Sequence, residues 1–225
     1  MELHLVIKMN EKLFLRDPQE TELGKSILHH SVVLIHNMGL ESFTFKKLAD
    51  AAGTTEATIY RYFENKHKLL IYLTAWYWSW LLYQISYVTN NIEDPGQQLK
   101  RIIHLLATPV EDDDNISYIN ESQLHQIVVD EGMKAYLTKQ VSADNKQQFF
   151  KPYKDVCAHI GNIILKCDPD YKYPHSLSSS IIEIAHLQKF FNKNLPSLTD
   201  FGKNDEPSIH AFLEELFFCN LKIAR

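Results

Sequence analysis

The sequence predicts an all-α protein, and three observations lead to this fold class. Apolar residues recur at intervals of three and four along most of the chain, whereas the alternation typical of strands is nearly absent. Capping residues, glycines and prolines stand at the ends of these periodic stretches, where helices begin and end. In addition, 225 residues with 45% hydrophobic side chains suffice to enclose a core.

Four helices are predicted in the first 90 residues, and each has a boundary signal. A glycine commonly ends a helix, while a threonine or asparagine side chain commonly caps its first turn. Two of the four are short and are separated by a tight turn that contains glycine. The predicted helices are a first one that ends at Gly39, 45–52 capped by Thr44, 56–63 capped by Thr55, and 66–90 capped by Asn65.

Further helices are predicted beyond residue 90, where no linker is long or polar enough to separate independent domains. Pro95 is placed to begin the next of them. The acidic loop EDDDN and the segments CDPDYKYPH and LPSLTDFGKNDEP interrupt the periodic pattern. The predicted ranges are Pro95 to just before Pro109, then about 117–130, 133–141, 145–166, 176–192 and 207–223.

Charge divides unevenly between the short helices before Lys66 and the longer helices after them. Residues 1–70 carry equal numbers of basic and acidic side chains, so the formal net charge of -5 lies in the rest of the chain. An acidic protein does not attract a polyanion through its net charge. Any contact with nucleic acid must therefore come from a local patch.

The sequence predicts a cytoplasmic protein without a membrane span. The opening apolar run, LHLVI, is too short for a signal peptide and is soon followed by charged residues. The long apolar segment 69–88 is interrupted by Ser79, Gln84 and Ser86 and by amphipathic Trp and Tyr rings. Three cysteines without CxxC spacing indicate a reducing compartment and are expected to be buried thiols.

The two short helices have the spacing of a helix-turn-helix, whose second helix enters the major groove of DNA. An ordinary helical hairpin in an all-α core has the same spacing, and spacing alone does not separate the two. The second helix, however, carries short or planar side chains with hydrogen-bonding tips, which suit phosphate oxygens and base edges. The packing set is Leu48, Ala49, Ala52, Ile59 and Phe63, and the outward set is Thr55, Thr58, Tyr60, Arg61 and Tyr62.

Residues 23–70 resemble the DNA-binding domain of the tetracycline-repressor (TetR) family of bacterial transcriptional regulators. The matching features are Gly39, then TFKKLADAAG from Thr44, then TTEATIYRYFENKHKLL from Thr54 to Leu70. The resemblance implies an N-terminal extension (1–20), a three-helix helix-turn-helix DNA-binding domain (21–67) and a larger helical ligand-binding and dimerisation domain (68–225). It also implies DNA contacts: Thr44 and Lys46 on phosphates, Thr58, Tyr60 and Lys66 on the DNA backbone, and Thr55, Glu56, Ala57, Arg61 and Tyr62 near base edges.

Three positions depart from the family pattern. Ala57 stands where glycine is usual, and its methyl group limits how closely the protein backbone can approach DNA. Glu56 stands where a basic or neutral residue is common, and its carboxylate can accept from a cytosine amino group or favour the helix N-terminus. His30 and Ser31 replace a pair of small residues in the first helix.

The predicted fourth helix carries an aromatic stripe that has two interpretations. Such a stripe is most often plain core, but an apolar cavity with a few polar tips binds small amphipathic molecules. The resemblance favours the second interpretation, because the family uses the corresponding helix to join its pocket and its DNA-binding domain. The stripe comprises Leu69, Leu73, Trp76, Trp80, Tyr83 and Tyr87, and the candidate polar groups are His104, His125 and His159, each of which also fits a hydrogen-bonded core histidine.

The last two predicted helices are amphipathic and form the candidate dimer surface. Two such helices from each of two chains can close a four-helix bundle, although both can also cover the protomer's own core. A two-fold pair would place two recognition helices one DNA turn apart, about 34 Å, as a palindromic site requires. The stripes are Leu177, Ile181, Ile184, Gln188 and Phe191 on one helix and Ile209, Phe212, Leu213, Leu216 and Phe217 on the other.

The sequence thus predicts a homodimeric, ligand-responsive regulator. It is expected to repress by binding a palindromic operator in double-stranded DNA and to leave the operator when a small apolar or amphipathic effector binds. No GxSxG, HExxH, GxGxxG, P-loop or CxxC motif occurs, so no enzymatic activity, cofactor or metal is predicted. A helical carrier of a lipid or haem, or an all-α enzyme with a site assembled from distant residues, stays open as the alternative.

Overall fold

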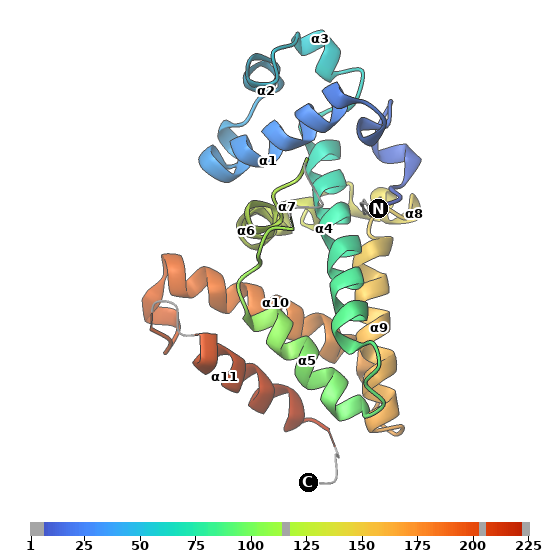
Figure 1. Cartoon of the computed structure of the whole chain (residues 1–225), viewed down its shortest axis with the longest axis vertical. Helices are drawn as coiled ribbons and strands as arrows, with labels where there is room; N and C mark the ends of the chain where they lie inside the picture. Colours follow the sequence, from blue (N-terminus) through green and yellow to red (C-terminus); the bar gives the residue numbers. More distant parts are fainter. Residues whose placement is uncertain (1–6, 114–117, 203–205, 222–225) are drawn as a thin grey trace. The chain divides into compact units, whose positions relative to one another are not determined.

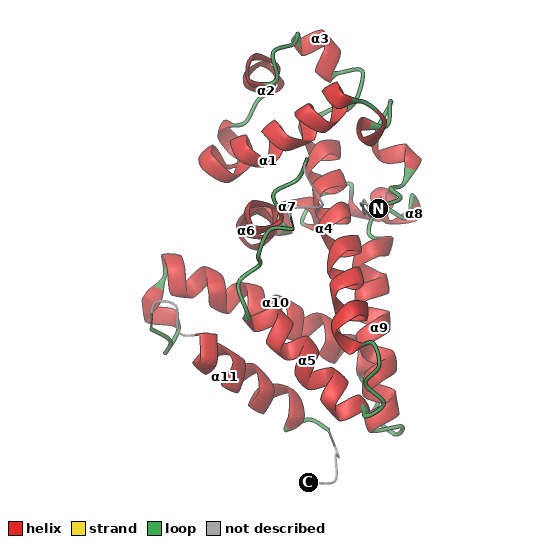
Figure 2. Cartoon of the chain, viewed as in Figure 1, coloured by secondary structure: helices red, strands yellow, loops and turns green. Residues whose placement is uncertain are grey.

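The computed structural model describes residues 7–113, 118–202 and 206–221. Within these residues the regular elements are all helices and none is a strand, which confirms the predicted all-α fold (Figure 2). No described helix has both the length and the apolar composition that crossing a membrane requires. The elements are η1 (Glu11–Leu13), η2 (Pro18–Glu20), α1 (Glu22–Ser42), α2 (Phe45–Ala51), α3 (Glu56–Ile59), α4 (Lys66–Thr89), α5 (Pro95–Ala107), α6 (Glu121–Glu131), α7 (Met133–Tyr136), α8 (Val141–Lys146), α9 (Lys151–Cys167), α10 (Pro174–Asn194), η3 (Pro196–Leu198) and α11 (Glu206–Phe218).

Capping side chains begin the helices of the N-terminal region as predicted. The Thr44 hydroxyl accepts a backbone N–H of the first turn of α2 at 3.3 Å, and the Asn65 side-chain oxygen does the same for α4 at 2.9 Å. The end of α1 differs from the prediction. Gly39 adopts a left-handed φ of 73°, which only glycine adopts without strain, but the chain winds on to Ser42 beyond this kink.

The predicted helix over 145–166 is two helices in the structure. Gln148 has a φ of 62° and separates α8 from α9. Further along, α6 begins at Glu121 behind the Asn120 cap. The predicted helix ends at Ser117 and Ile223 lie outside the described residues.

The chain packs as two compact units. The first comprises residues up to Ser79 together with 110–152, and the second comprises residues 80–109 together with those from Tyr153 onward. The N-terminal part of helix α4, up to Ser79, belongs to the first unit, and the rest of α4 belongs to the second. This division concerns packing, so the functional domain boundaries at residues 20 and 67 stay predictions.

The first unit contains η1, η2, α1, α2, α3, α6, α7, α8 and the first part of α4. Helix α1 packs against α6 and against η2, and α2 packs against α3 (Figure 1). Buried side chains from several of these helices form its core. They include Ile27, Leu28, Ile35, Leu48, Ile59, Phe63, Tyr72, Trp76 and Leu124.

The second unit contains α5, α9, α10, α11 and the last part of α4. Helix α11 packs against both α5 and α10, and these three lie side by side (Figure 1). Pro95 occupies the first turn of α5, as predicted, and Asp94 caps that helix by accepting from the Gly96 N–H at 2.9 Å. The amphipathic face of α5 buries Leu99, Ile102 and Ile103.

Candidate DNA interface and effector region

The turn between α2 and α3 is closed by backbone hydrogen bonds. The Ala52 N–H donates to Leu48 at 2.9 Å, and the Thr54 N–H donates to Ala49 at 2.9 Å. Gly53 lies between them with a φ of 64°, a left-handed conformation that favours glycine. The glycine therefore sets the angle between the two helices.

Apolar contacts hold α3 against α2, and a cap at Thr55 fixes the first turn of α3. Leu48 and Ile59 are fully buried between them. At the start of α3, the Thr55 hydroxyl accepts the Thr58 N–H at 3.3 Å and shares a hydrogen bond with the Thr58 hydroxyl at 2.9 Å. The ring of Tyr60 packs edge-on against the Phe45 ring, with centroids 5.0 Å apart.

Most predicted DNA contacts lie at the surface of this pair of helices. Thr58 is partly covered, and Tyr60 keeps 48% of its surface exposed despite its contact with Phe45. Lys46 and Arg61 form no ion pair with any described residue, so their charges are available to an anion. The exposed residues are Thr44, Lys46, Thr55, Glu56, Ala57, Tyr60, Arg61 and Lys66.

The prediction that Tyr62 points outward is wrong. Its side chain is 2% exposed, and its hydroxyl shares a hydrogen bond of 2.9 Å with the Thr21 hydroxyl, which also caps α1. The reason is that α3 ends at Ile59. The N–H groups of Arg61 and Tyr62 donate three residues back instead of four, so these positions do not follow the helical face assumed from the sequence.

Lys66 has a structural role that its position at the surface did not predict. Its ammonium donates to the carbonyls of Leu40 and Glu41 at 3.2 and 3.5 Å. Cations near the C-terminal carbonyls of a helix are favourable, and here the contact ties the start of α4 to the end of α1. An ammonium has three N–H groups, so one donor is left for a phosphate.

The segment that contains α2 and α3 matches the model of a known protein family. Residues 27–73 match the model of the bacterial regulatory proteins of the tetR family. The match covers 47 of the 225 residues, and these include α2 and α3. No curated protein sequence matches the chain.

Solved structures share the fold of this chain along most of its length. The structure of AibR in complex with isovaleryl coenzyme A and operator DNA is 16% identical, covers 88% of this chain and 98% of its own, and has a TM-score of 0.61. The fatty acid degradation regulator FadR from Bacillus halodurans is 17% identical, with 85% and 96% covered and a TM-score of 0.57. SmeT, the repressor of the Stenotrophomonas maltophilia multidrug efflux pump SmeDEF, is 15% identical, with 91% of each chain covered and a TM-score of 0.56. At these identities the likeness shows the fold alone.

The aromatic stripe of α4 is buried at one end and exposed at the other. Trp76 is fully buried and Trp80 is 4% exposed, whereas Tyr83 and Tyr87 are 47% and 69% exposed. The four residues share one face of α4, but no described element covers that face near its C-terminal end. Tyr83 and Tyr87 are therefore not walls of an enclosed pocket in this chain, contrary to the prediction.

The three candidate histidines lie in different surroundings. His104 is exposed, and the centroid of its ring lies 5.4 Å from that of the His210 ring. Its predicted place in a pocket is therefore wrong. His125 is buried in the first unit, where Nδ1 is 2.8 Å from the Tyr77 hydroxyl. His159 is half-buried in the second unit, where burial and then Lys166 lower its pKa.

A buried group of polar side chains in the first unit was not predicted. Glu121 is 1% exposed, and neither carboxylate oxygen has a hydrogen-bond partner; the Tyr72 hydroxyl and the Trp76 indole N–H are also buried without one. Burial raises the pKa of Glu121 to about 7 against the opposing effect of backbone amides, and Asp112 and Asp113 raise it further. Burial raises the pKa of Tyr118 against the opposing effect of Trp76, and the charges of Asp17 and then Glu121 raise it further; the Tyr118 hydroxyl donates to Gln19 at 2.8 Å. Because Glu121 directly follows a capping asparagine, the sequence indicates only an exposed acid of a first turn.

Helix α6 connects this buried group to the end of α1. Glu121 is its first residue and Glu131 its last. The Glu131 carboxylate accepts the Leu40 N–H at 3.1 Å, directly after the kink at Gly39, and pairs with Lys134 at 2.6 Å. The residues that precede α2 are therefore held by the far end of the helix that carries Glu121.

The predicted dimer surface is divided between core and surface. Ile181, Ile209, Leu213 and Phe217 are buried inside the second unit, so these four are wrong as interface residues. The remaining members, Leu177, Ile184, Gln188, Phe191, Phe212 and Leu216, are exposed or partly exposed. A groove of about 270 Å³ between α10 and α11 is lined by Leu177, Ile184 and Leu216, and Leu187 beyond it is 46% exposed.

Proposed function

We propose that the chain is a ligand-responsive repressor that binds a palindromic operator as a homodimer and leaves it when a small effector binds. The observation that carries the DNA-binding part is the exposed surface of α2 and α3. Lys46 on α2 and Tyr60 and Arg61 directly after α3 are exposed, while the apolar faces of the two helices are buried. No residue is assigned a catalytic role.

The DNA contacts divide into two kinds. Thr44 and Lys46, at the start of α2, hold phosphates and set the register, while Arg61 and the end of α3 approach base edges. The Tyr60 hydroxyl binds the DNA backbone while the Tyr60 ring keeps its edge-on contact with the Phe45 ring. Glu56 is an exposed acid in this surface, and it lowers affinity for phosphates while it favours the N-terminus of α3.

A binding titration tests this assignment. The protein would first select its own duplex from a random pool, and the affinity for that duplex would be measured by fluorescence anisotropy over a salt series. We expect Lys46→Ala to weaken binding about five-fold and to reduce the salt slope by about one. Tyr60→Phe, which keeps the contact with Phe45, should also weaken binding. Lys172→Ala removes an exposed charge from the second unit and serves as the control. Equal affinity in all four proteins would refute the assignment.

Homodimerisation is proposed through the exposed faces of α10 and α11. Leu187 and Phe212 are 46% and 37% exposed, which leaves apolar area for a partner. We expect Leu187→Glu with Phe212→Glu to give monomers in sedimentation and to weaken operator binding at least ten-fold. Leu198→Glu changes an equally exposed leucine on η3 and should leave the dimer intact. A monomeric wild-type protein would contradict the proposal.

The effector site is proposed at the buried polar group of the first unit. Trp76 was among the predicted effector residues, and Glu121 and Tyr72 add an acceptor and a donor that lack partners. Leaving buried polar atoms unpaired is unfavourable, so a ligand that bonds to them gains affinity. The matching polar group is one that both donates and accepts, such as a hydroxyl or an amide, on a small apolar body. A carboxylate would be repelled by Glu121.

Release from DNA follows if the effector shifts α6. Movement of Glu121 at one end of α6 displaces Glu131 at the other, which holds the Leu40 N–H next to α2. The effector must bind the DNA-free arrangement better than the DNA-bound one, since a ligand with equal affinity for both shifts nothing.

Tryptophan fluorescence tests the effector site. The probes are an alcohol, an amide, an amine and a carboxylate with the same alkyl chain. We expect the amide or alcohol to quench the wild-type protein and the carboxylate not to. Trp76→Phe should lose the quenching, whereas Trp78→Phe, whose indole N–H already donates to Tyr136 at 2.7 Å, should keep it. Quenching that survives in Trp76→Phe would place the ligand elsewhere.

A further inference from the structure

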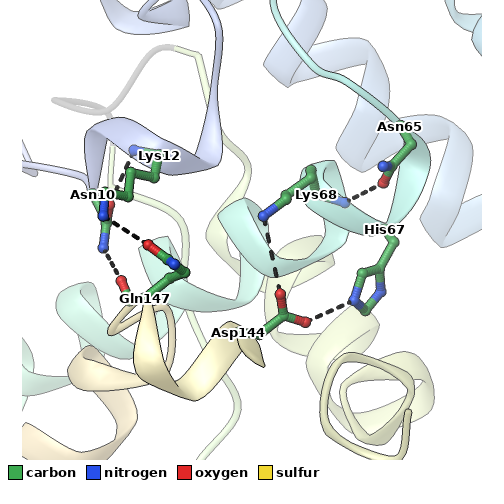
Figure 3. A network of polar contacts seen from close by, with 7 residues as sticks. All are labelled: Asn10, Lys12, Asn65, His67, Lys68, Asp144 and Gln147. Carbon is green, nitrogen blue, oxygen red and sulfur yellow. Dashed lines mark hydrogen bonds and ion pairs between the residues drawn. The ribbon is translucent and has the colours of Figure 1, made fainter. Parts of the chain in front are cut away.

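The N-terminal segment 7–20 is packed on the first unit instead of extending from it. Ile7, Met9 and Leu13 are buried. The Asn10 amide donates to the Gln147 carbonyl at 2.8 Å, and the Lys12 ammonium donates to the Gln147 side chain at 2.7 Å (Figure 3). These contacts fasten the segment to the end of α8.

The same corner of α8 also fixes the first turn of α4. Asp144 is buried and accepts from His67 at 3.3 Å, and its other oxygen lies 4.0 Å from the Lys68 ammonium (Figure 3). Lys68 also lies over the Phe149 ring at 3.9 Å. The N-terminal segment and the start of α4 are thus anchored to one common element, so their mutual position is set within the unit.

The tip of the segment lies against the end of the recognition region. The Leu15 N–H donates to the Tyr62 carbonyl at 2.8 Å, and the Arg16 guanidinium lies 5.6 Å above the Tyr62 ring. Tyr62 directly follows Arg61, which is exposed. The buried Tyr62 ring therefore also positions Arg16, because the Arg16 guanidinium stacks on it.

Arg16 has an available charge at this tip. Its side chain is exposed, and it forms no ion pair with a described residue. The adjacent acid does not neutralise it by pairing, because the Asp17 carboxylate accepts the Gln19 N–H at 2.8 Å in the cap of η2. Leu15 beside it is 68% exposed, as expected for a tip that faces outward.

Resting on the DNA-binding function proposed above, we infer that segment 14–17 is a second DNA-contacting element, in which Arg16 binds a phosphate beside the site approached by α3. A guanidinium stacked on a ring loses less side-chain freedom on binding than a free one, and its planar donors suit a phosphate. The exposed cations of α2 and α3 are few, and Glu56 opposes them. One further phosphate contact therefore has a measurable effect on affinity.

The test compares Arg16→Ala with Arg101→Ala, which removes an exposed arginine from α5 in the second unit. Affinity for the duplex selected by the wild-type protein is measured over a salt series. We expect Arg16→Ala to weaken binding about five- to ten-fold at about 0.1 M salt and to lower the slope of log K against log salt by about one, while Arg101→Ala changes neither. Arg16→Lys, which keeps the charge, should keep the slope.

The outcomes separate this inference from the DNA-binding function. If Tyr60→Phe and Lys46→Ala weaken binding but Arg16→Ala behaves like Arg101→Ala, only the contact at Arg16 is overturned. Weaker binding of Arg16→Ala with an unchanged salt slope and a lower melting temperature would show that Arg16 merely supports Tyr62, which also overturns it. If the wild-type protein selects no duplex at all, the DNA-binding function and this inference both fail.

Discussion

Replacing Glu121 with glutamine is expected to make the protein more stable at neutral and alkaline pH. Glu121 is 1% exposed, its carboxylate oxygens have no hydrogen-bond partner, and burial raises its pKa to about 7. An acid whose pKa is higher in the folded than in the unfolded chain destabilises the fold once it must ionise. Glu121 therefore costs no stability below about pH 4.5, stability falls as the pH rises from there to about 7, and the loss is constant above that pH.

The size of the effect follows from the two pKa values. With about 7 in the folded chain and 4.5 in the unfolded chain, ionisation lowers the free energy of unfolding by roughly 3 kcal/mol at pH 8 and by roughly 1 kcal/mol at pH 5. Glutamine has a similar shape and does not ionise. The stabilisation gained by Glu121→Gln should therefore grow by about 2 kcal/mol between pH 5 and pH 8.

Urea unfolding followed by circular dichroism at several pH values between 5 and 8 measures this difference. Glu64→Gln, in the same unit but at an exposed position, serves as the control and should show a difference near zero throughout. His186 is buried, and burial, then Lys189, lower its pKa to about 3, so it lowers stability below about pH 6.5. That contribution is common to all the proteins compared and cancels. A Glu121→Gln protein that is less stable than wild type at pH 8, or a difference that does not change with pH, would refute the reasoning.

Three further predictions concern packing and charge. Gly24→Ala should lower the free energy of unfolding by at least about 2 kcal/mol in urea unfolding, because an added Cβ would overlap the backbone of Pro18, which cannot move without displacing η2. Tyr62→Phe should lower it by about 1 kcal/mol by removing the hydrogen bond to Thr21, and an unchanged value would mean that water replaces the lost partner. Glu56→Gln should strengthen binding to non-specific duplex about three-fold at low salt in anisotropy titrations, because it removes a negative charge from the DNA-facing surface; weaker binding would instead indicate a base contact by the carboxylate.

Local signals account for the helices that the sequence predicted. Thr44, Thr55 and Asn65 cap the helices they were expected to cap, because a cap depends on residues within one turn. Tertiary contacts decide the elements that were missed. The break at Gln148 has no glycine or proline to mark it, and the first 3-10 turn, η1, is held by hydrogen bonds to Gln147 at the end of α8, far away in the sequence.

The same distinction explains the errors at the candidate sites. The outward placement of Tyr62 assumed that the helical period continues past Ile59, and the short hydrogen bonds there rotate the side chain inward. The apolar stripes of the last two helices were correct in period. A period cannot tell which neighbour covers a stripe, and Leu213 and Phe217 are covered by the protomer itself.

The position of the buried polar group has a consequence for regulation that the aromatic stripe alone did not suggest. Trp76 lies on α4 ten residues after Lys66, about 15 Å along the helix, and Glu121 begins α6. Both helices end on the same stretch of α1: the Lys66 ammonium binds the Leu40 carbonyl, and the Glu131 carboxylate binds the Leu40 N–H. An effector that bonds to Trp76 and Glu121 together would therefore act on the two peptide groups that flank Leu40, shortly before α2. Because linkage is reciprocal, operator DNA that fixes this stretch of α1 must weaken effector binding by the same factor by which the effector weakens DNA binding.

Measuring effector affinity with and without operator, in wild type and in Glu131→Gln, would show whether the coupling depends on α6. A coupling factor that Glu131→Gln leaves unchanged would assign it to α4 alone.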